Sequence, residues 1–250
     1  MPDIRTFTLG EFQTNCYVVS ASSTERGGVL PAASAGSTAG KAGGPTAWFG
    51  RGGRTTPPVG SRPCWIVDCG YEPELMLDAI DEEGLRPVAI LLTHCHSDHI
   101  AGVDAALSRF GSMPIYVHEA EAGFCSNPAL NLSAFIGRPI TCTEPDHLLT
   151  GGETLTLEGE SWRVVHAPGH SPGGVLYIHD ASKQAIVGDT LFAGSIGRFD
   201  FPTSSGEDLE HTIREVLMAL PDDMTIHPGH GPATTIGRER RTNPFVVGGF

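Results

Sequence analysis

Apolar residues of this chain gather in short runs that are separated by turns rich in glycine, proline and aspartate. Short apolar runs bounded by turn residues predict strands, whereas apolar residues three and four positions apart predict helices. The predicted strands cover residues 6–11, 15–19, 64–67, 88–93, 114–117, 153–157, 162–166, 175–179, 185–187 and 225–227. The predicted helices cover residues 73–83, 98–110 and 206–219, and residues 119–145 are expected to be mostly helix and loop. This order predicts two similar halves, with two sheets packed face to face and helices outside, in an α+β fold.

Residues 21–62 interrupt this pattern. They are rich in Gly, Ala, Ser and Pro and lack any sustained apolar period. Such a composition buries too little apolar surface to offset the entropy of ordering it, so we expect a disordered insertion that the fold tolerates. The alternative is a mobile flap in which Trp48 and Phe49 contact a substrate.

Length and composition narrow the class of protein. A chain of 250 residues with 40% hydrophobic content can bury one sizeable core, so we expect a single domain over residues 1–250. The net charge of −13 argues against a nucleic-acid partner, and no apolar run of the sequence is long enough for a membrane span. The first residues lack the apolar run of a signal peptide, and the six cysteines form no C-x-x-C pair. We therefore expect a cytoplasmic protein with reduced thiols and no membrane partner.

The densest group of metal-ligand side chains is the run His94-Cys95-His96-Ser97-Asp98-His99, which follows a predicted strand. Side chains alternate along an extended segment, so His94 and His96 point to one side and Cys95 to the other, where we expect a small buried residue. Asp98 and His99 fall at the start of a predicted helix, which turns them toward a neighbouring point. Imidazole and carboxylate groups suit zinc, iron or manganese. The run therefore predicts two adjacent groups of metal ligands.

Three further candidate ligands follow other apolar runs. His170 and His230 each follow a Pro-Gly pair beyond a predicted strand, and Asp189 lies just past another strand. Loops at strand ends, positioned by a rigid sheet, are where binding residues concentrate. A carboxylate such as Asp189 can bridge two cations about 3.5–4 Å apart. The remaining histidines, which we expect to be surface or hydrogen-bonded core residues, are His118, His147, His166, His179, His211 and His227.

Together these motifs resemble the metallo-β-lactamase superfamily of hydrolases, and within it the glyoxalase II (hydroxyacylglutathione hydrolase) group. The matching pieces are residues 93–99, 168–173, 188–192, 194–198 and 228–231. The tail at residues 234–245 is similar, more narrowly, to that of short single-domain bacterial glyoxalase II enzymes. The resemblance covers residues 1–20 and 63–250, and it implies the four-layer αββα sandwich of the superfamily.

The resemblance also implies how the ligands are divided between two metal ions that share a hydroxide. The first ion would take His94, His96 and His170, the second would take Asp98, His99 and His230, and Asp189 would bridge them. Asp98 would also act in catalysis by orienting the hydroxide. Asp68 matches an aspartate that supports the ligand loop, the alternative being a turn residue at a strand end. Arg198 matches a basic position near the substrate tail, the alternative being a salt bridge with Asp200.

The implied activity is the hydrolysis of an acyl thioester, with S-lactoylglutathione or a related small molecule as substrate. Two divalent metal ions, with zinc expected and iron or manganese as alternatives, would lower the pKa of bound water from 15.7 to about 7. A β-lactam or lactone hydrolase would use the same chemistry.

The alternative is an oxidoreductase resembling persulfide dioxygenase, in which His94, His170 and Asp189 bind one iron ion. The complete ligand set argues against a non-catalytic metal-binding protein, and the motif at 228–231 and the tail favour hydrolysis. The C-terminal helical domain of full-length glyoxalase II enzymes is expected to be absent.

Overall fold

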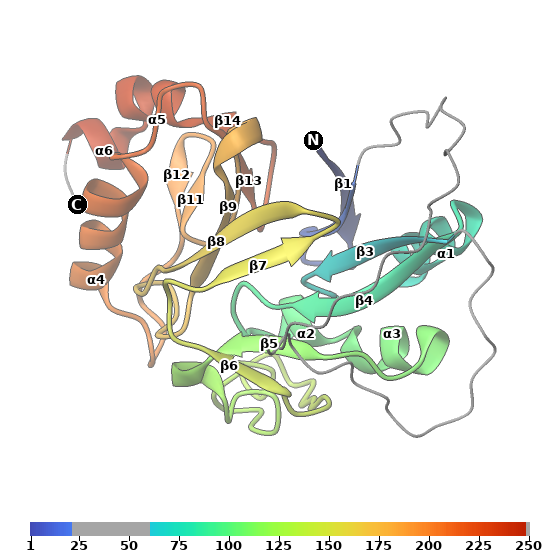
Figure 1. Cartoon of the computed structure of the whole chain (residues 1–250). Coiled ribbons are helices and arrows are strands. Elements are labelled where there is room, and N and C mark those ends of the chain that lie inside the picture. Colours follow the sequence, from blue (N-terminus) through green and yellow to red (C-terminus); the bar gives the residue numbers. More distant parts are fainter. Residues whose placement is uncertain (22–60, 249–250) are drawn as a thin grey trace, which may run out of the picture.

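A computed structural model of the chain describes residues 1–21 and 61–248, and these residues form two sheets with helices on their outer faces (Figure 1). The first sheet has the strand order β1-β2-β3-β4-β5-β6 and the second has the order β14-β13-β10-β9-β8-β7. All strands of the first sheet precede residue 150 and all strands of the second follow it, so each sheet is built from one half of the chain.

The first sheet mixes antiparallel and parallel pairs. Its strands are β1 (Pro2–Leu9), β2 (Thr14–Ala21), β3 (Arg62–Val67), β4 (Leu85–Leu91), β5 (Ile115–His118) and β6 (His147–Leu149). The pairs β1–β2 and β2–β3 are antiparallel, and the pairs from β3 to β6 are parallel. Helices α1 (Glu74–Glu82), α2 (Ser97–Ile100) and α3 (Val103–Phe110) connect these strands, and a 3-10 turn, η1 (Glu119–Glu121), follows β5.

The second sheet is mostly antiparallel. Its strands are β7 (Thr154–Leu157), β8 (Glu160–His166), β9 (Val175–His179), β10 (Gln184–Gly188), β13 (Thr225–Pro228) and β14 (Thr234–Thr235). Only the pair β10–β13 is parallel among the described strands of this sheet. A small hairpin, β11 (Leu191–Phe192) and β12 (Ser195–Ile196), follows β10. The helical elements are η2 (Asp180–Ser182), α4 (Gly206–His211), the π-helical η3 (Thr212–Leu217), α5 (Ile236–Thr242) and α6 (Pro244–Gly248).

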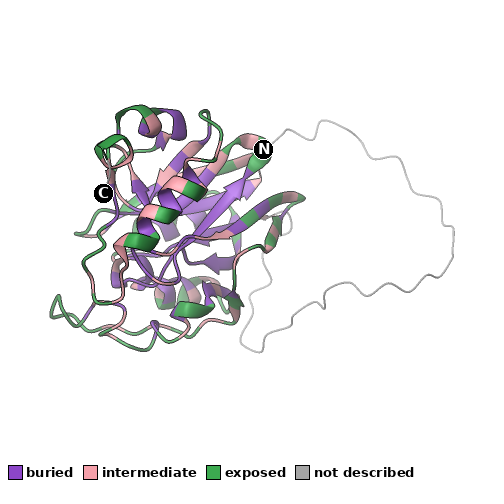
Figure 2. Ribbon diagram, turned by 90° about the vertical axis from the view of Figure 1, so that its left-hand side faces the viewer, coloured by how far each residue is buried: buried purple, intermediate pink, exposed green. Residues whose placement is uncertain are grey.

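Three clusters of buried side chains separate the layers. In β2, Cys16 and Val18 pack in an outer cluster with residues of α1 and α3, whereas Tyr17 and Val19 pack in a middle cluster between the sheets. This is the alternation expected of a strand that is buried on both faces. A third cluster joins the second sheet to α4, η3 and α5. The buried strands and the outer helices with exposed sides can be followed in Figure 2. The prediction of a four-layer αββα sandwich is therefore confirmed.

Several predicted elements differ from the structure. The helix predicted at residues 98–110 is split into α2 and α3, because Gly102 lies so close to Gly70 that a side chain would meet its carbonyl oxygen at 2.5 Å. The first strand covers Pro2–Leu9 and not residues 6–11, because the chain turns at Gly10, which has a φ of +60°. Between η1 and β6, residues 122–146 form turns and loop, and helix is absent from this described segment. The sequence pattern does not predict the strands β6, β11, β12 and β14 or the helices α5 and α6.

The predicted insertion lies almost entirely outside the described residues. The predicted range of residues 21–62 is one residue too long at each end, because Ala21 is the last residue of β2 and Arg62 is the first residue of β3. A guanidinium nitrogen of Arg62 donates to the Ala21 carbonyl at 3.2 Å, so the two attachment points lie side by side. None of the helices within residues 1–21 and 61–248 has the length and apolar character needed to span a bilayer.

Candidate metal centre

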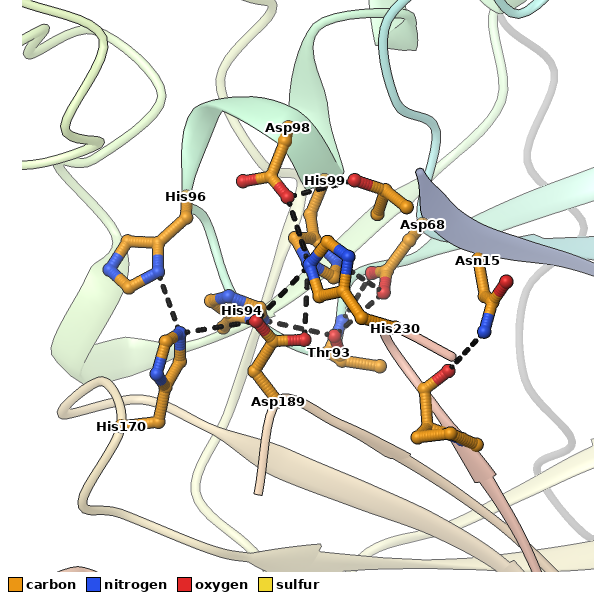
Figure 3. Close-up of polar contacts among 12 residues, drawn as sticks. Asn15, Asp68, Thr93, His94, His96, Asp98, His99, His170, Asp189 and His230 are labelled. Carbon is orange, nitrogen blue, oxygen red and sulfur yellow. Dashed lines mark hydrogen bonds and ion pairs between the residues drawn. The ribbon is translucent and has the colours of Figure 1, made fainter. Parts of the chain in front are cut away.

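All seven predicted ligands lie at one edge of the sandwich, in segments that follow strands (Figure 3). His94 and His96 follow β4 in an extended loop, and Asp98 and His99 lie on α2 directly afterwards. From the second sheet come His170, Asp189 and His230, which follow β8, β10 and β13 respectively. Because the two sheets meet at this edge, residues far apart in the sequence come within contact distance.

The first group of ligand atoms belongs to His94, His96 and His170. One ligand atom of each lies within 4.8 Å of the others, and Nδ1 of His96 lies 2.9 Å from Nε2 of His170. The buried Nε2 atom of His94 has no hydrogen-bond partner among the described residues. An unpaired nitrogen buried beside two other imidazoles is costly unless a further group binds it. These three side chains therefore fit a metal ion.

The second group consists of Asp98, His99 and His230. Nε2 of His230 lies 3.2 Å from Oδ2 of Asp98, and Nε2 of His99 lies 3.5 Å from the same oxygen. The Nε2 atom of His99 is buried and, like that of His94, has no hydrogen-bond partner within the described chain. One carboxylate and two imidazoles are a suitable ligand set for zinc or iron.

Asp189 lies between the two groups. Its Oδ2 atom is 3.5 Å from Nε2 of His170 and 3.4 Å from Nε2 of His230, and its Oδ1 atom is 3.5 Å from Nε2 of His99. Gly229 makes room for it, because a side chain at this position would begin 2.0 Å from Oδ1 of Asp189. The carboxylate therefore reaches ligands of both groups, as a bridging ligand must.

Asp68 and Thr93 hold the ligand loop in position through hydrogen bonds. The buried carboxylate of Asp68 accepts hydrogen bonds from the backbone N–H of Thr93 at 2.7 Å, from the Thr93 hydroxyl at 2.7 Å and from Nδ1 of His99 at 2.8 Å. The Thr93 hydroxyl, having donated to Asp68, can accept from Nδ1 of His94 at 3.2 Å. These contacts hold a proton on Nδ1 of His94 and of His99, so Nε2 is the nitrogen of each ring that faces the metal position. The geometry is that expected of an aspartate which supports the loop.

His170 is oriented in the same manner. Its Nδ1 atom donates to the backbone carbonyl of Arg198 at 2.8 Å, which leaves Nε2 free to face Asp189 and His96. Gly197 allows the segment that carries Arg198 to lie against Asp189, because a side chain at position 197 would collide with the backbone carbonyl oxygen of Asp189.

The electrostatics of the two groups differ in the metal-free protein. Burial, together with repulsion from neighbouring imidazoles, lowers the pKa of His94 and lowers that of His96 to about 3, and burial also lowers the pKa of His170. These imidazoles are therefore neutral at pH 7 and offer a lone pair. Burial also lowers the pKa of His230, but hydrogen bonds to Asp189 and Asp98 outweigh it and raise this pKa to about 10.

The other members of the second group follow the same balance. For His99 the nearby carboxylates, Asp98 first, outweigh burial and raise the pKa well above its usual value. For Asp98 and Asp189, burial raises the pKa, but His99 and His230 lower it by more. Without metal the second group is thus a cluster of imidazolium and carboxylate groups, in which protons occupy the place of a cation.

The side chain of Arg198 makes the alternative contact named above. Its guanidinium donates two hydrogen bonds of 2.9 Å to Asp200, and its Cζ atom lies 4.4 Å from the centre of the Phe201 ring. That ring is edge-on to His96 at a centroid distance of 5.4 Å, so Arg198 lies at the rim of the metal centre.

Cys95, as expected, is fully buried and packs in the outer cluster, away from the ligands.

Sequence reasoning gave no role to several residues that contact the ligands. Thr93 lies inside the quoted motif, and its position next to His94 was the available signal. Thr14 donates its hydroxyl proton to Oδ2 of Asp98 at 2.8 Å, and Glu121 accepts from the backbone of Cys95 at 2.5 Å. Neither lies in a segment with a metal-ligand pattern, so only the tertiary structure reveals them.

Comparisons with known proteins agree with this geometry. The family model described as the metallo-beta-lactamase superfamily matches residues 59–230. The chain is 38% identical over 186 residues to the "Probable metallo-hydrolase YqgX" of Bacillus subtilis, which covers 74% of this chain and 88% of that protein. It is 38% identical over 183 residues to the "Hydroxyacylglutathione hydrolase GloC" of Haemophilus influenzae, which covers 72% and 86% respectively.

Two solved structures are similar over almost the whole chain. The crystal structure of BLEG-1 B3 metallo-beta-lactamase has a TM-score of 0.79 at 34% identity, covering 98% of this chain and 100% of that one. The crystal structure of TTHA1623 in a di-iron-bound form has a TM-score of 0.70 at 32% identity, covering 96% and 99%. The fold, the family match and these identities lead to one conclusion: the chain belongs to the metallo-β-lactamase superfamily and is a metallo-hydrolase of that family.

Proposed function

We propose that the protein hydrolyses acyl thioesters at a dinuclear metal centre, with S-lactoylglutathione or a related thioester as substrate. The observation that carries this proposal is the position of Asp189, whose two carboxylate oxygens lie 3.4–3.5 Å from His170, His230 and His99. A carboxylate that lies between two groups of three ligands each suits two cations better than one. The sequence identity of 38% to a protein named hydroxyacylglutathione hydrolase supports thioesters as the substrate class.

Two divalent cations in these positions would supply a hydroxide at neutral pH and stabilise negative charge on the carbonyl oxygen of the substrate. His94, His96 and His170 would bind the first ion, Asp98, His99 and His230 the second, and Asp189 both. We propose zinc for both positions because imidazole and carboxylate ligands suit it. Iron is the main alternative, since a similar structure is described as di-iron-bound.

The residues of this chain have separate tasks in the reaction. Asp98 would orient the nucleophile, and the Thr14 hydroxyl fixes that carboxylate through its hydrogen bond of 2.8 Å. Asp68 holds His99 and the Thr93 loop in position. The leaving thiolate is stable near neutral pH, so the proposal requires no separate general acid. Arg198 at the rim would pair with a carboxylate of the substrate after leaving Asp200.

We further propose a small-molecule substrate, with neither nucleic acid nor membrane as partner, and a cytoplasmic location. All six cysteines are free thiols, and five of them are buried. Unpaired cysteines are typical of reducing compartments.

The test is metal analysis combined with a panel of thioesters. We expect two metal ions per chain and cleavage of S-lactoylglutathione, followed by release of the free thiol. Oxygen consumption with glutathione persulfide, at one iron per chain, would move the assignment to the persulfide dioxygenase class.

A further inference from the structure

Glu121 connects the two loops that carry the first group of ligands. It ends η1, beyond β5, and its side chain is fully buried. Its Oε2 atom accepts a hydrogen bond of 2.5 Å from the backbone N–H of Cys95, the residue between His94 and His96. Its Oε1 atom accepts one of 2.9 Å from the backbone N–H of Gly173, in the loop that contains His170.

The chemistry of Glu121 is specific to a carboxylate. Both oxygens face N–H donors, so an amide in its place would meet one of these donors with its own NH₂ group. A buried donor that loses its acceptor is destabilising, and the two loops would then no longer be joined through this side chain. Gly173 fits closely against Glu121, because a side chain on Gly173 would begin 2.7 Å from Cγ of Glu121.

Asn15 has the corresponding place beside the second group. Its Nδ2 atom donates to the Pro228 carbonyl at 3.0 Å and to the Gly231 carbonyl at 2.8 Å, and these residues flank His230. The Thr8 hydroxyl donates to its Oδ1 atom at 2.9 Å, which fixes the orientation of the amide. Figure 3 labels Asn15 together with Asp98 and His230 of the second group. The preceding residue, Thr14, binds Asp98 of the same group.

We propose that Glu121 and Asn15 are positioning residues for separate metal ions, Glu121 for the first and Asn15 for the second. Each joins a residue from the first half of the chain to a ligand loop from the second half, and the two networks share no residue. This inference rests on the dinuclear centre proposed above. Loss of the Glu121 contacts should lower the metal affinity of the first position alone, and loss of the Asn15 contacts should lower that of the second position alone.

Two isosteric substitutions test the proposal. Glu121→Gln retains the shape but removes one acceptor, and Asn15→Asp retains the shape but places a carboxylate oxygen against two backbone carbonyls. Each is made in two backgrounds with a single metal position, His230→Ala for the first position and His170→Ala for the second. Zinc affinity is measured in the full chain by titration against a chromophoric chelator, with zinc alone as the probe.

The expected result is a crossed pattern. Glu121→Gln lowers zinc affinity about 10–100-fold in the His230→Ala background and leaves it unchanged in the His170→Ala background. Asn15→Asp does the reverse. An equal loss in both backgrounds, or no loss in either, would overturn the proposal, because a general effect on the fold cannot select one position.

Two further variants keep the test valid if an isosteric substitution prevents folding, which far-UV circular dichroism of the metal-free protein would reveal. Gly173→Ala displaces Glu121 without removing any hydrogen-bonding group, and Thr8→Val removes the hydroxyl that fixes the orientation of the Asn15 amide. The same crossed pattern is expected of them, and a uniform loss of affinity would contradict the proposal. If the wild-type protein binds two zinc ions but cleaves no thioester, the proposed function fails while this inference stands.

Discussion

Nδ1 of His96 lies 2.9 Å from Nε2 of His170, although 74 positions separate the two residues in the chain. One side chain follows β4 of the first sheet and the other follows β8 of the second. Two imidazole nitrogens at this distance either share a proton or bind a common cation. Because burial lowers the pKa of both imidazoles, both are neutral near pH 7, and each can offer a nitrogen lone pair to such a cation.

Replacing His230 tests the second metal position. We expect His230→Ala to reduce the metal content from two ions per chain to one and to lower kcat/KM for thioester hydrolysis by at least about 100-fold, since even residues outside the ligand set cost 10–100-fold. His227→Ala is the matched control, because His227 lies on β13, the strand that precedes His230, and its Nε2 atom contacts Gln184 and not the metal centre. Hydrolysis that survives His230→Ala at the wild-type rate would contradict a two-metal mechanism.

Asp68 is expected to matter through the orientation of His99 and Thr93. Asp68→Asn removes one of the acceptor sites used by three donors, so zinc affinity and kcat/KM should each fall about 10–100-fold. Asp104→Asn is a suitable control, since Asp104 likewise accepts from the N–H and hydroxyl of a threonine, Thr143, on an exposed part of the fold. Isothermal titration with zinc compares the two variants, and equal affinities would rule out a role for Asp68 in the site.

The pH dependence of metal binding should differ between the two positions. In the metal-free protein His230 has a pKa of about 10 and that of His99 is also raised, so a metal ion entering the second position must displace protons. Its affinity there should rise about tenfold or more for each pH unit between about 7 and 9. His94, His96 and His170 have lowered pKa values and are neutral over this range, so the first position should show little change.

Zinc titrations at several pH values, in the two single-position variants, measure this difference. His170→Ala retains His99 and His230 and should show the steep dependence, whereas His230→Ala should show the flat one. The same slope in both variants would mean that the two groups are not electrostatically distinct.

Arg198 and Asp200 allow the role of the rim to be measured. If Arg198 binds a carboxylate of the substrate, Arg198→Ala should raise KM for S-lactoylglutathione about tenfold, the lower end of what a charge-assisted hydrogen bond contributes, because the guanidinium is exposed to solvent. Asp200→Ala should lower KM, because it frees the guanidinium. Changes of KM in the same direction for both variants would assign Arg198 to the salt bridge alone. A neutral thioester, which has no carboxylate for Arg198 to bind, is the control substrate.

Removing residues 22–60 tests the expectation that the insertion is passive. The chain leaves at Ala21 and returns at Arg62, at the end of β2 opposite to Thr14 and the metal centre. At about 3.4 Å per residue, the seven steps along the eight-residue β2 separate these ends by roughly 24 Å. A short turn joining Ala21 to Ser61 should therefore preserve the unfolding temperature and kcat/KM. A large rise in KM would instead support the flap with Trp48 and Phe49.

Much of the fold could be predicted because the middle strands are buried on both faces and appear as apolar runs, as in β4 and β9. The break between α2 and α3 could not, because it depends on the approach of Gly102 to Gly70 across the fold. The same contrast holds for the site. The seven candidate ligands have a residue type and spacing that chemistry requires, whereas Glu121 and Asn15 act through backbone groups of distant loops. Such contacts leave no pattern in the local sequence.

Each group of ligands takes members from both sheets, and the two sheets come from consecutive halves of the chain. A chain cleaved in the connection between β6 and β7 would yield two fragments, and neither would contain a full set of donors for either cation. Reassembly of such fragments would depend on the concentration of free metal. A split reporter cut at this point is therefore expected to respond to a divalent metal ion.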